Sequence, residues 1–163
     1  MLNTELRVKS GLTYGARSAI ERASQPGPAS ISSFTKTETT KAAIDLAIAT
    51  LDRLHKDGLD AATIESAKRY VAGQYAPTLE TAPQLAAQLD DMTLYGDSRQ
   101  TIDGYLGTIA GATPAQIAEA RAVFPDSKDL AIVAIGDASK IRDWMKAYGP
   151  LTEMKLTDPR FSP

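Results

Sequence analysis

Apolar residues recur every third or fourth position through much of the chain, which is the spacing of one buried helix face. The longest such stretch predicts a helix over about residues 40–56, which Asp57 and Gly58 end. Further helices are predicted wherever a start or stop signal brackets the same spacing. They are expected from Asp60 to near Pro77, after Thr81 to Tyr95 with Leu85, Leu89 and Met92 facing inward, after Thr113 to Phe124, and after Asp137 or Ser139 to Gly149.

Two weaker helical patterns complete this part of the prediction. A short amphipathic stretch with Leu2 and Leu6 opens the chain, and Gly11 is expected to end it. Residues 97–112 are also expected to be helical, with interruptions at Gly104 and Gly107.

Two stretches near the N-terminus alternate loosely between apolar and polar residues, which is typical of strands. They span residues 12–21 and 29–37, and Ser24-Gln25-Pro26-Gly27-Pro28 between them predicts the turn of an antiparallel hairpin. Residues 130–135, Leu-Ala-Ile-Val-Ala-Ile, predict a strand that is central in a sheet or covered on both faces. Residues 151–156 predict an edge strand. Helices grouped together, rather than alternating with strands, indicate an α+β fold.

The composition then narrows the range of partners. The 163 residues suit one domain, and a formal net charge of −2 without a basic cluster argues against nucleic-acid binding. The adjacent cations Lys68 and Arg69 with Tyr70 are typical of a solvated helix face and not of a base-stacking platform. No apolar run is long enough to cross a membrane, so no membrane span is expected.

Metal and nucleophile chemistry has little support in the residues. The chain has no cysteine and one histidine, His55, so a site that needs a thiolate or two imidazoles cannot be built from it. His55 is expected at the last turn of a helix and facing solvent, where an imidazolium interacts favourably with the helix dipole. Asp90 and Asp91 point about 100° apart on a helix and do not share an ion easily. No metal site is therefore predicted in this chain.

One short motif is a candidate functional site. It consists of Arg7, Gly11, Leu12 and Tyr14, in the pattern R-x-x-x-G-L-x-Y. A helix that ends at Gly11 and turns directly into a strand places Arg7 before the reversal and Tyr14 just after it. Both side chains are then able to face one cavity. A guanidinium and a phenol together offer donors to a peptide carbonyl or to a developing oxyanion. The alternative to this functional interpretation is that Arg7 is an ordinary exposed helical arginine and Tyr14 an ordinary half-buried strand tyrosine.

The same residues carry a family resemblance. The segment Leu6-Arg7-Val8-Lys9-Ser10-Gly11-Leu12-Thr13-Tyr14 resembles the ELR-x-x-x-GLxY motif of the insulinase/pitrilysin-type zinc peptidases, which include mitochondrial processing peptidase. Further motifs follow in the order and spacing of the family's C-terminal, non-catalytic domain, so the resemblance covers nearly the whole chain. They are Leu79-Glu80-Thr81-Ala82, Leu94-Tyr95-Gly96, Thr113-Pro114 and Ile132-Val133-Ala134-Ile135-Gly136-Asp137.

The resemblance implies a fold and separate roles for a catalytic half and a substrate-binding half. It implies an α+β half-domain, with an antiparallel or mixed sheet packed on one face by helices, and two such halves closing like a clamshell around an unfolded peptide. One half carries H-x-x-E-H, which binds zinc and supplies the base. The other half contributes substrate contacts, and by carry-over Arg7 and Tyr14 hold the peptide and support the oxyanion, with Gly11 and Leu12 forming the structural turn of the motif.

The chain departs from the family pattern in two ways. H-x-x-E-H is absent, so no catalytic residue and no bound zinc are expected here, and zinc is expected in a catalytic partner half. The family's half-domain also begins with a strand and a helix before the ELR segment, and this chain begins inside that helix. We therefore expect an N-terminally truncated domain over residues 1–157, a tail at 158–163, and an unpaired sheet edge that favours association of copies.

The expected function follows from the resemblance. The chain is expected to be the non-catalytic, substrate-binding half of a zinc metalloendopeptidase, inactive alone, whose H-x-x-E-H half lies in the same polypeptide or in a separate subunit. The alternative is a stand-alone peptide-binding or structural module on the same fold, without proteolysis. An alanine-rich, cysteine-free chain fits a bacterial source, and a periplasmic or cytoplasmic location is expected.

Overall fold

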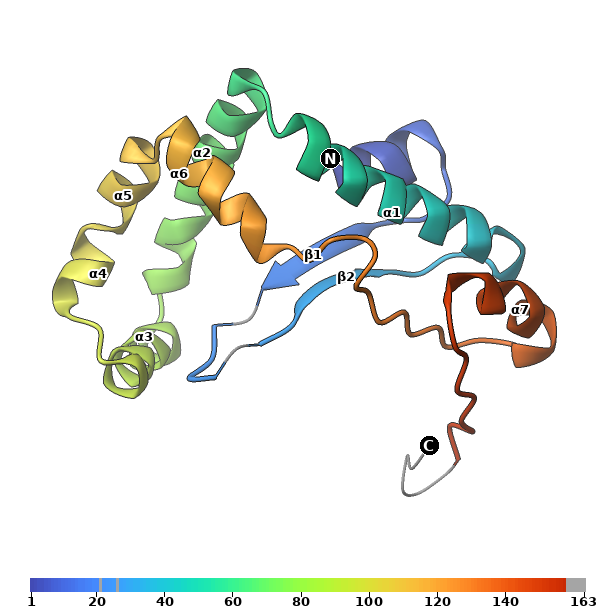
Figure 1. Cartoon of the computed structure of the whole chain (residues 1–163). Helices are drawn as coiled ribbons and strands as arrows, with labels where there is room; N and C mark the ends of the chain where they lie inside the picture. Colours follow the sequence, from blue (N-terminus) through green and yellow to red (C-terminus); the bar gives the residue numbers. More distant parts are fainter. Residues whose placement is uncertain (21, 26, 158–163) are drawn as a thin grey trace. The chain divides into compact units, whose positions relative to one another are not determined.

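The structure is a computed structural model that describes residues 1–20, 22–25 and 27–157, so the predicted tail at 158–163 lies outside the described residues (Figure 1). Short helical turns are labelled η. The elements in chain order are η1 Thr4–Lys9, β1 Ala16–Ile20, β2 Ala29–Ser33, η2 Thr37–Thr39, α1 Thr40–Asp57, α2 Ala61–Tyr75, η3 Ala76–Leu79, α3 Ala82–Tyr95, α4 Arg99–Asp103, α5 Tyr105–Gly111, α6 Pro114–Ala120, η4 Arg121–Val123, α7 Ala138–Met145 and η5 Lys146–Tyr148.

The chain forms two compact units. Unit 1 consists of Met1–Glu21, Gly27–His55 and Pro125–Pro163, and unit 2 consists of Arg22–Pro26 and Lys56–Phe124. The described part is mostly helical with a two-stranded antiparallel sheet, which confirms the α+β prediction. None of its helices has the length and apolar character needed to cross a membrane.

The predicted hairpin is present in unit 1 but its strands are shorter than predicted. β1 and β2 pair antiparallel from Ala16 opposite Ser33 to Ile20 opposite Ala29. Tyr14, expected within the first strand, lies before β1. The strand begins later because the Thr13 hydroxyl accepts a hydrogen bond from the Gly15 N–H, which takes that amide out of the ladder.

The core of unit 1 is small and centred on Leu6, which is 1% exposed. Leu6 clusters with Ala16 of β1 and Ala43 of α1, and partly buried apolar residues pack around them. These are Leu2, Leu12, Leu46 and Ala47. The N-terminal turn, the hairpin and α1 therefore form one packed group around a single leucine.

Unit 2 is an assembly of helices, and the starts of α2, α3 and α6 are predicted correctly from the sequence. The Asp60 carboxylate accepts a hydrogen bond from the Thr63 N–H at the start of α2. Thr81 and Thr113 form capping boxes at the starts of α3 and α6. Gly104 separates α4 from α5 as predicted, whereas Gly107 lies inside α5 without interrupting it.

The predicted inner face of α3 is wrong for Leu85 and Leu89 and correct for Met92, which is partly buried. Leu85 and Leu89 are 47% and 60% exposed, and the less exposed side of the helix instead carries Gln88, Met92 and Tyr95. An apolar stripe identifies a helix face but not whether another element covers it.

The prediction of a buried strand at residues 130–135 is also wrong. No strand is assigned there, and the side chains of Val133 and Ile135 are 87% and 77% exposed. Within the described part of the chain, no hydrogen bond is formed by the backbone of residues 130–135. A strand needs a neighbour to satisfy its N–H and C=O groups, and no described segment supplies one. The edge strand predicted at residues 151–156 is absent for the same reason, and that segment is exposed.

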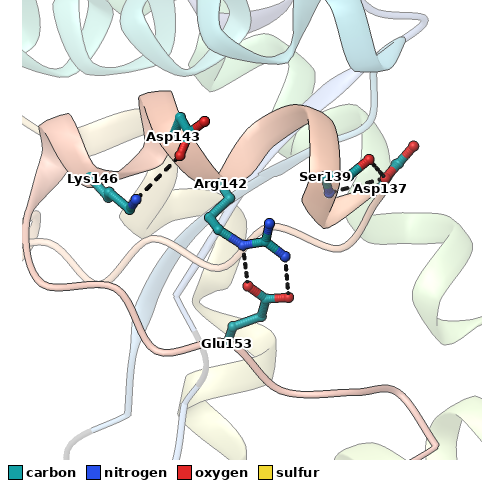
Figure 2. A network of polar contacts seen from close by, with 6 residues as sticks. All are labelled: Asp137, Ser139, Arg142, Asp143, Lys146 and Glu153. Carbon is teal, nitrogen blue, oxygen red and sulfur yellow. Dashed lines mark hydrogen bonds and ion pairs between the residues drawn. The ribbon is translucent and has the colours of Figure 1, made fainter.

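The end of unit 1 is held by polar contacts around α7 (Figure 2). Asp137, rather than Ser139, is the N-cap of α7 and accepts a hydrogen bond from the Ser139 N–H. Arg142 donates two hydrogen bonds to Glu153, at 2.7 and 2.9 Å, which tie the following extended segment back to the helix. This bidentate pair lowers the pKa of the Glu153 carboxyl below its ordinary value.

Candidate functional site

The candidate site is built on the turn that follows η1. Gly11 has φ +63°, the left-handed conformation that ends many helices. Its N–H donates to the Arg7 carbonyl at 3.2 Å, and the Leu12 N–H donates to the Leu6 carbonyl at 2.9 Å. The predicted role of Gly11 as a helix stop is therefore confirmed. The chain changes direction at Gly11 and Leu12, directly after the last turn of η1, which carries Arg7.

Buried groups below the turn hold it in place. Leu6 is nearly fully buried and Leu12 packs against the core cluster. The hydroxyl of Thr13, 8% exposed, lies 2.7 Å from the Phe34 carbonyl and 2.9 Å from the hydroxyl of Ser33, which donates to it. These contacts attach the turn to the end of β2, so the residue that follows, Tyr14, leaves the turn in a defined direction.

The structure brings Arg7 and Tyr14 together. The Arg7 Cζ atom lies 4.8 Å from the centroid of the Tyr14 ring, within the range of a cation–π contact. Arg7 is exposed and Tyr14 is 76% exposed, so Tyr14 is not the half-buried strand residue of the structural alternative. Among the described residues, Arg7 forms no ion pair, and the residue is exposed to solvent.

The one carboxylate on η1 is committed elsewhere. Glu5 accepts from Lys9 at 3.0 Å and from Arg53 at 2.9 Å. These two cations lower the pKa of the Glu5 carboxyl below its ordinary value, so it stays ionised and paired with them. The same contacts attach η1 to α1, which carries Arg53, and neither of the ion pairs described for η1 involves Arg7.

The described residues do not fit a zinc site. In residues 1–20, 22–25 and 27–157, no group of three or more His, Cys, Asp or Glu side chains is placed to hold a metal ion. His55, predicted to face solvent, is instead partly buried, and its Nε2 atom lies 3.1 Å from the Pro125 carbonyl within unit 1. No step of chemistry is therefore assigned to a metal held by these residues.

A second cluster, inside unit 2, is one that the sequence patterns did not reveal. Arg22 donates two hydrogen bonds to Asp97, at 2.5 and 3.0 Å, and its guanidinium lies 4.3 Å from the ring centroid of Tyr95. It borders a pocket of 280 Å³ in which Tyr75 and Tyr105 stack at 4.1 Å. Because 75 positions separate Arg22 from Asp97, no local spacing could have indicated the pair.

The comparisons with known proteins point to one class of domain. Residues 1–71 match the family model described as the peptidase M16 inactive domain. Among solved structures, the chain is similar to the peptidase M16 inactive domain from Pseudomonas fluorescens, at 25% identity and a TM-score of 0.65 over 73% of this chain. The chain covers 28% of the length of that protein. No curated protein matches the chain.

Both findings describe a non-catalytic peptidase domain with an α+β half-domain fold, and the N-terminal match contains the turn with Arg7 and Tyr14. The resemblance predicted from the sequence is therefore confirmed, because residues 1–71 match the peptidase M16 inactive domain and the fold is similar to that of a solved M16 inactive domain.

Proposed function

We propose that this chain is the substrate-binding, non-catalytic half of a zinc metalloendopeptidase, in which Arg7 and Tyr14 contact the bound peptide. The observation that carries the proposal is the exposed pairing of the two side chains, 4.8 Å apart, on a turn fixed by Gly11. This turn lies within the residues that match the M16 inactive domain.

The two side chains suit an extended peptide whose carbonyl becomes negatively charged during hydrolysis. A guanidinium presents several N–H donors in a rigid plane, and a phenol adds one O–H donor. Donors aimed at a developing oxyanion stabilise it more than they stabilise the neutral carbonyl, so they lower the barrier. The Tyr14 ring below the guanidinium restricts the rotation of Arg7, so less freedom is lost when the peptide binds.

The catalytic zinc and its base belong to an H-x-x-E-H half, in the same polypeptide or in a separate subunit. One histidine in 163 residues does not supply that motif. The chemistry of water attack is thus expected in the partner half, and this chain binds and orients the peptide.

The first experiment is to recover the native protein from its source cells with an antibody against this domain. The intact mass and the peptide sequences of the captured material would show whether an H-x-x-E-H half accompanies it. A zinc-dependent peptidase activity in the captured material supports the proposal. Recovery of the chain without an H-x-x-E-H half and without activity contradicts it and favours the stand-alone binding module.

The second experiment tests the two residues in that assembled enzyme. We expect Arg7→Ala to lower kcat by about 10²-fold, the usual effect of removing one oxyanion donor, and Arg7→Lys to recover only part of it. Tyr14→Phe keeps the ring under the guanidinium and removes only the hydroxyl. Arg17→Ala is the matched control, because Arg17 is an exposed arginine of β1 outside this turn. Equal activity of the Arg7→Ala and Arg17→Ala enzymes would refute the assigned role.

A further inference from the structure

The pocket of 280 Å³ inside unit 2 has an aromatic and apolar floor. The partly buried residues of its lining include Tyr75, Met92, Ile102 and Tyr105. Tyr75 and Tyr105 stack at 4.1 Å, and the Tyr75 hydroxyl donates to the Ile102 carbonyl at 2.9 Å. The tyrosine pair is therefore held in place by unit 2 itself. A pocket of this size has room for one side chain or a small organic molecule.

Two polar side chains that line this pocket have no partner in the described structure. Gln88 and Asp91 lie three positions apart on α3, so they share a helix face. Among the described residues, neither side chain forms a hydrogen bond or an ion pair. Gln88 is partly buried and Asp91 is exposed, so an amide and a carboxylate are accessible to a ligand beside the tyrosine pair.

The lining of the pocket carries a net negative charge. Arg22 and Asp97 neutralise each other through two hydrogen bonds, so the Asp91 carboxylate is the uncompensated charge among the lining residues. This charge disfavours phosphates and carboxylates and favours a cation. The neighbouring cluster already holds a cation in the same way, because the Arg22 guanidinium binds the Asp97 carboxylate and lies 4.3 Å from the centroid of the Tyr95 ring. The pocket thus offers a second carboxylate with tyrosine rings, without a guanidinium of its own.

We propose that this pocket binds an organic cation with a guanidinium head and a short apolar stem. The head donates to the Asp91 carboxylate and to the Gln88 amide oxygen, and the stem contacts Met92 and the tyrosine rings. A guanidinium suits the pocket better than an ammonium, because it is planar, stacks on aromatic rings and donates two parallel hydrogen bonds to a carboxylate. A free small molecule and an arginine side chain of a polypeptide both present this chemistry. The inference is independent of the peptidase proposal, which concerns Arg7 and Tyr14.

Binding is tested with the full chain by titrating n-butylguanidinium and following the backbone amide shifts by NMR. We expect saturable shifts centred on α3 and α5, with a dissociation constant of about 1 mM, as for a small ligand with one charged contact. The neutral analogue n-butylurea has the same shape without the charge. It should bind at least about tenfold more weakly, because the charge-assisted hydrogen bonds are lost.

The adjacent carboxylates of α3 provide a matched pair of variants. Asp91→Asn should raise the dissociation constant by about fivefold, the upper range for an exposed ion pair, and Asp91 is exposed, so the circular dichroism should not change. Asp90→Asn should leave the dissociation constant unchanged, because Asp90 does not line the pocket. Tyr105→Phe keeps the ring and should bind as the natural protein does. Arg7→Ala should also bind normally, so a failure of the peptidase proposal is distinguishable from a failure of this one.

The source of the cation is identified with the blocked peptide N-acetyl-Ala-Arg-Ala-amide. Binding of this peptide at least as tightly as n-butylguanidinium, with the same sensitivity to Asp91→Asn, supports an arginine side chain as the ligand. Binding of n-butylguanidinium alone supports a free cation. Shifts that do not saturate with either probe, an equal affinity for n-butylurea, or an affinity that Asp91→Asn leaves unchanged or lowers no more than Asp90→Asn does would each overturn the proposal.

Discussion

Gly11 offers the sharpest test of the turn that carries Arg7 and Tyr14. Its φ of +63° is a conformation that costs an L-residue about 1–2 kcal/mol. A Cβ atom placed at Gly11 meets no other atom within 4 Å, so Gly11→Ala adds no clash. Alanine also restricts the unfolded chain, which offsets the cost by about 0.4–1 kcal/mol. We therefore expect Gly11→Ala to lower the free energy of unfolding by about 1 kcal/mol.

Gly73 provides a control with the opposite sign. It lies inside α2, and a Cβ atom there also meets nothing within 4 Å. Because alanine is the better helix former, Gly73→Ala should raise the free energy of unfolding by about 0.5–1 kcal/mol. The same substitution is thus expected to destabilise at one glycine and to stabilise at the other, and only the backbone conformation differs.

The measurement is urea unfolding followed by far-UV circular dichroism, with the midpoints of the variants compared at a constant slope. Gly11→Asn should lie between the natural protein and Gly11→Ala, because asparagine adopts the left-handed conformation more readily than alanine does. A Gly11→Ala protein that is as stable as the natural one would mean that Gly11 is not left-handed in solution. Gly11 would then not fix the turn that positions Arg7 and Tyr14.

Three further predictions concern stability. Leu6→Ala should lower the free energy of unfolding by about 2–5 kcal/mol because Leu6 is 1% exposed. Val8→Ala, at a position that is 76% exposed, should lower it by about 0.5 kcal/mol or less. Equal urea midpoints for the two variants would contradict a core centred on Leu6. Thr113→Ala removes the cap of α6 and should cost about 1 kcal/mol, measured in the same way. Arg22 lowers the pKa of Asp97, so this carboxylate stabilises the fold above its unfolded pKa, and the stabilisation is lost as the pH falls through its lower folded pKa. The stability difference between the natural protein and Asp97→Asn should therefore be constant near neutral pH and shrink below about pH 4, and a difference that grows on acidification would refute the pairing.

The helix ends were predictable because their interactions are local. A cap depends on residues three positions apart, so Asp60 with Thr63 and Thr113 with Gln116 could be read directly from the sequence. Gly11 belongs to the same class, because its hydrogen bond reaches back only four residues. Local chemistry of this kind is nearly independent of what the rest of the chain does.

The proximity of Arg7 and Tyr14 in the candidate site could also be predicted, because it depends on local chain geometry. Arg7 and Tyr14 are seven positions apart around a helix end, so the turn alone brings them together. Arg22 and Asp97 are equally well paired, but the packing of unit 2 rather than local spacing makes their contact. A site assembled from distant segments leaves no periodic trace in the sequence, which is why this second cluster was missed.

Two of the wrong predictions, the inward-facing leucines of α3 and the strand at residues 130–135, have a common cause. Apolar spacing specifies the kind of neighbour that a segment needs, not whether that neighbour lies in the same chain. A helix without its neighbour keeps its own backbone hydrogen bonds, so α3 forms with Leu85 and Leu89 exposed. A strand has no such internal bonds, so in the described structure residues 130–135 form no regular element and their backbone is unpaired.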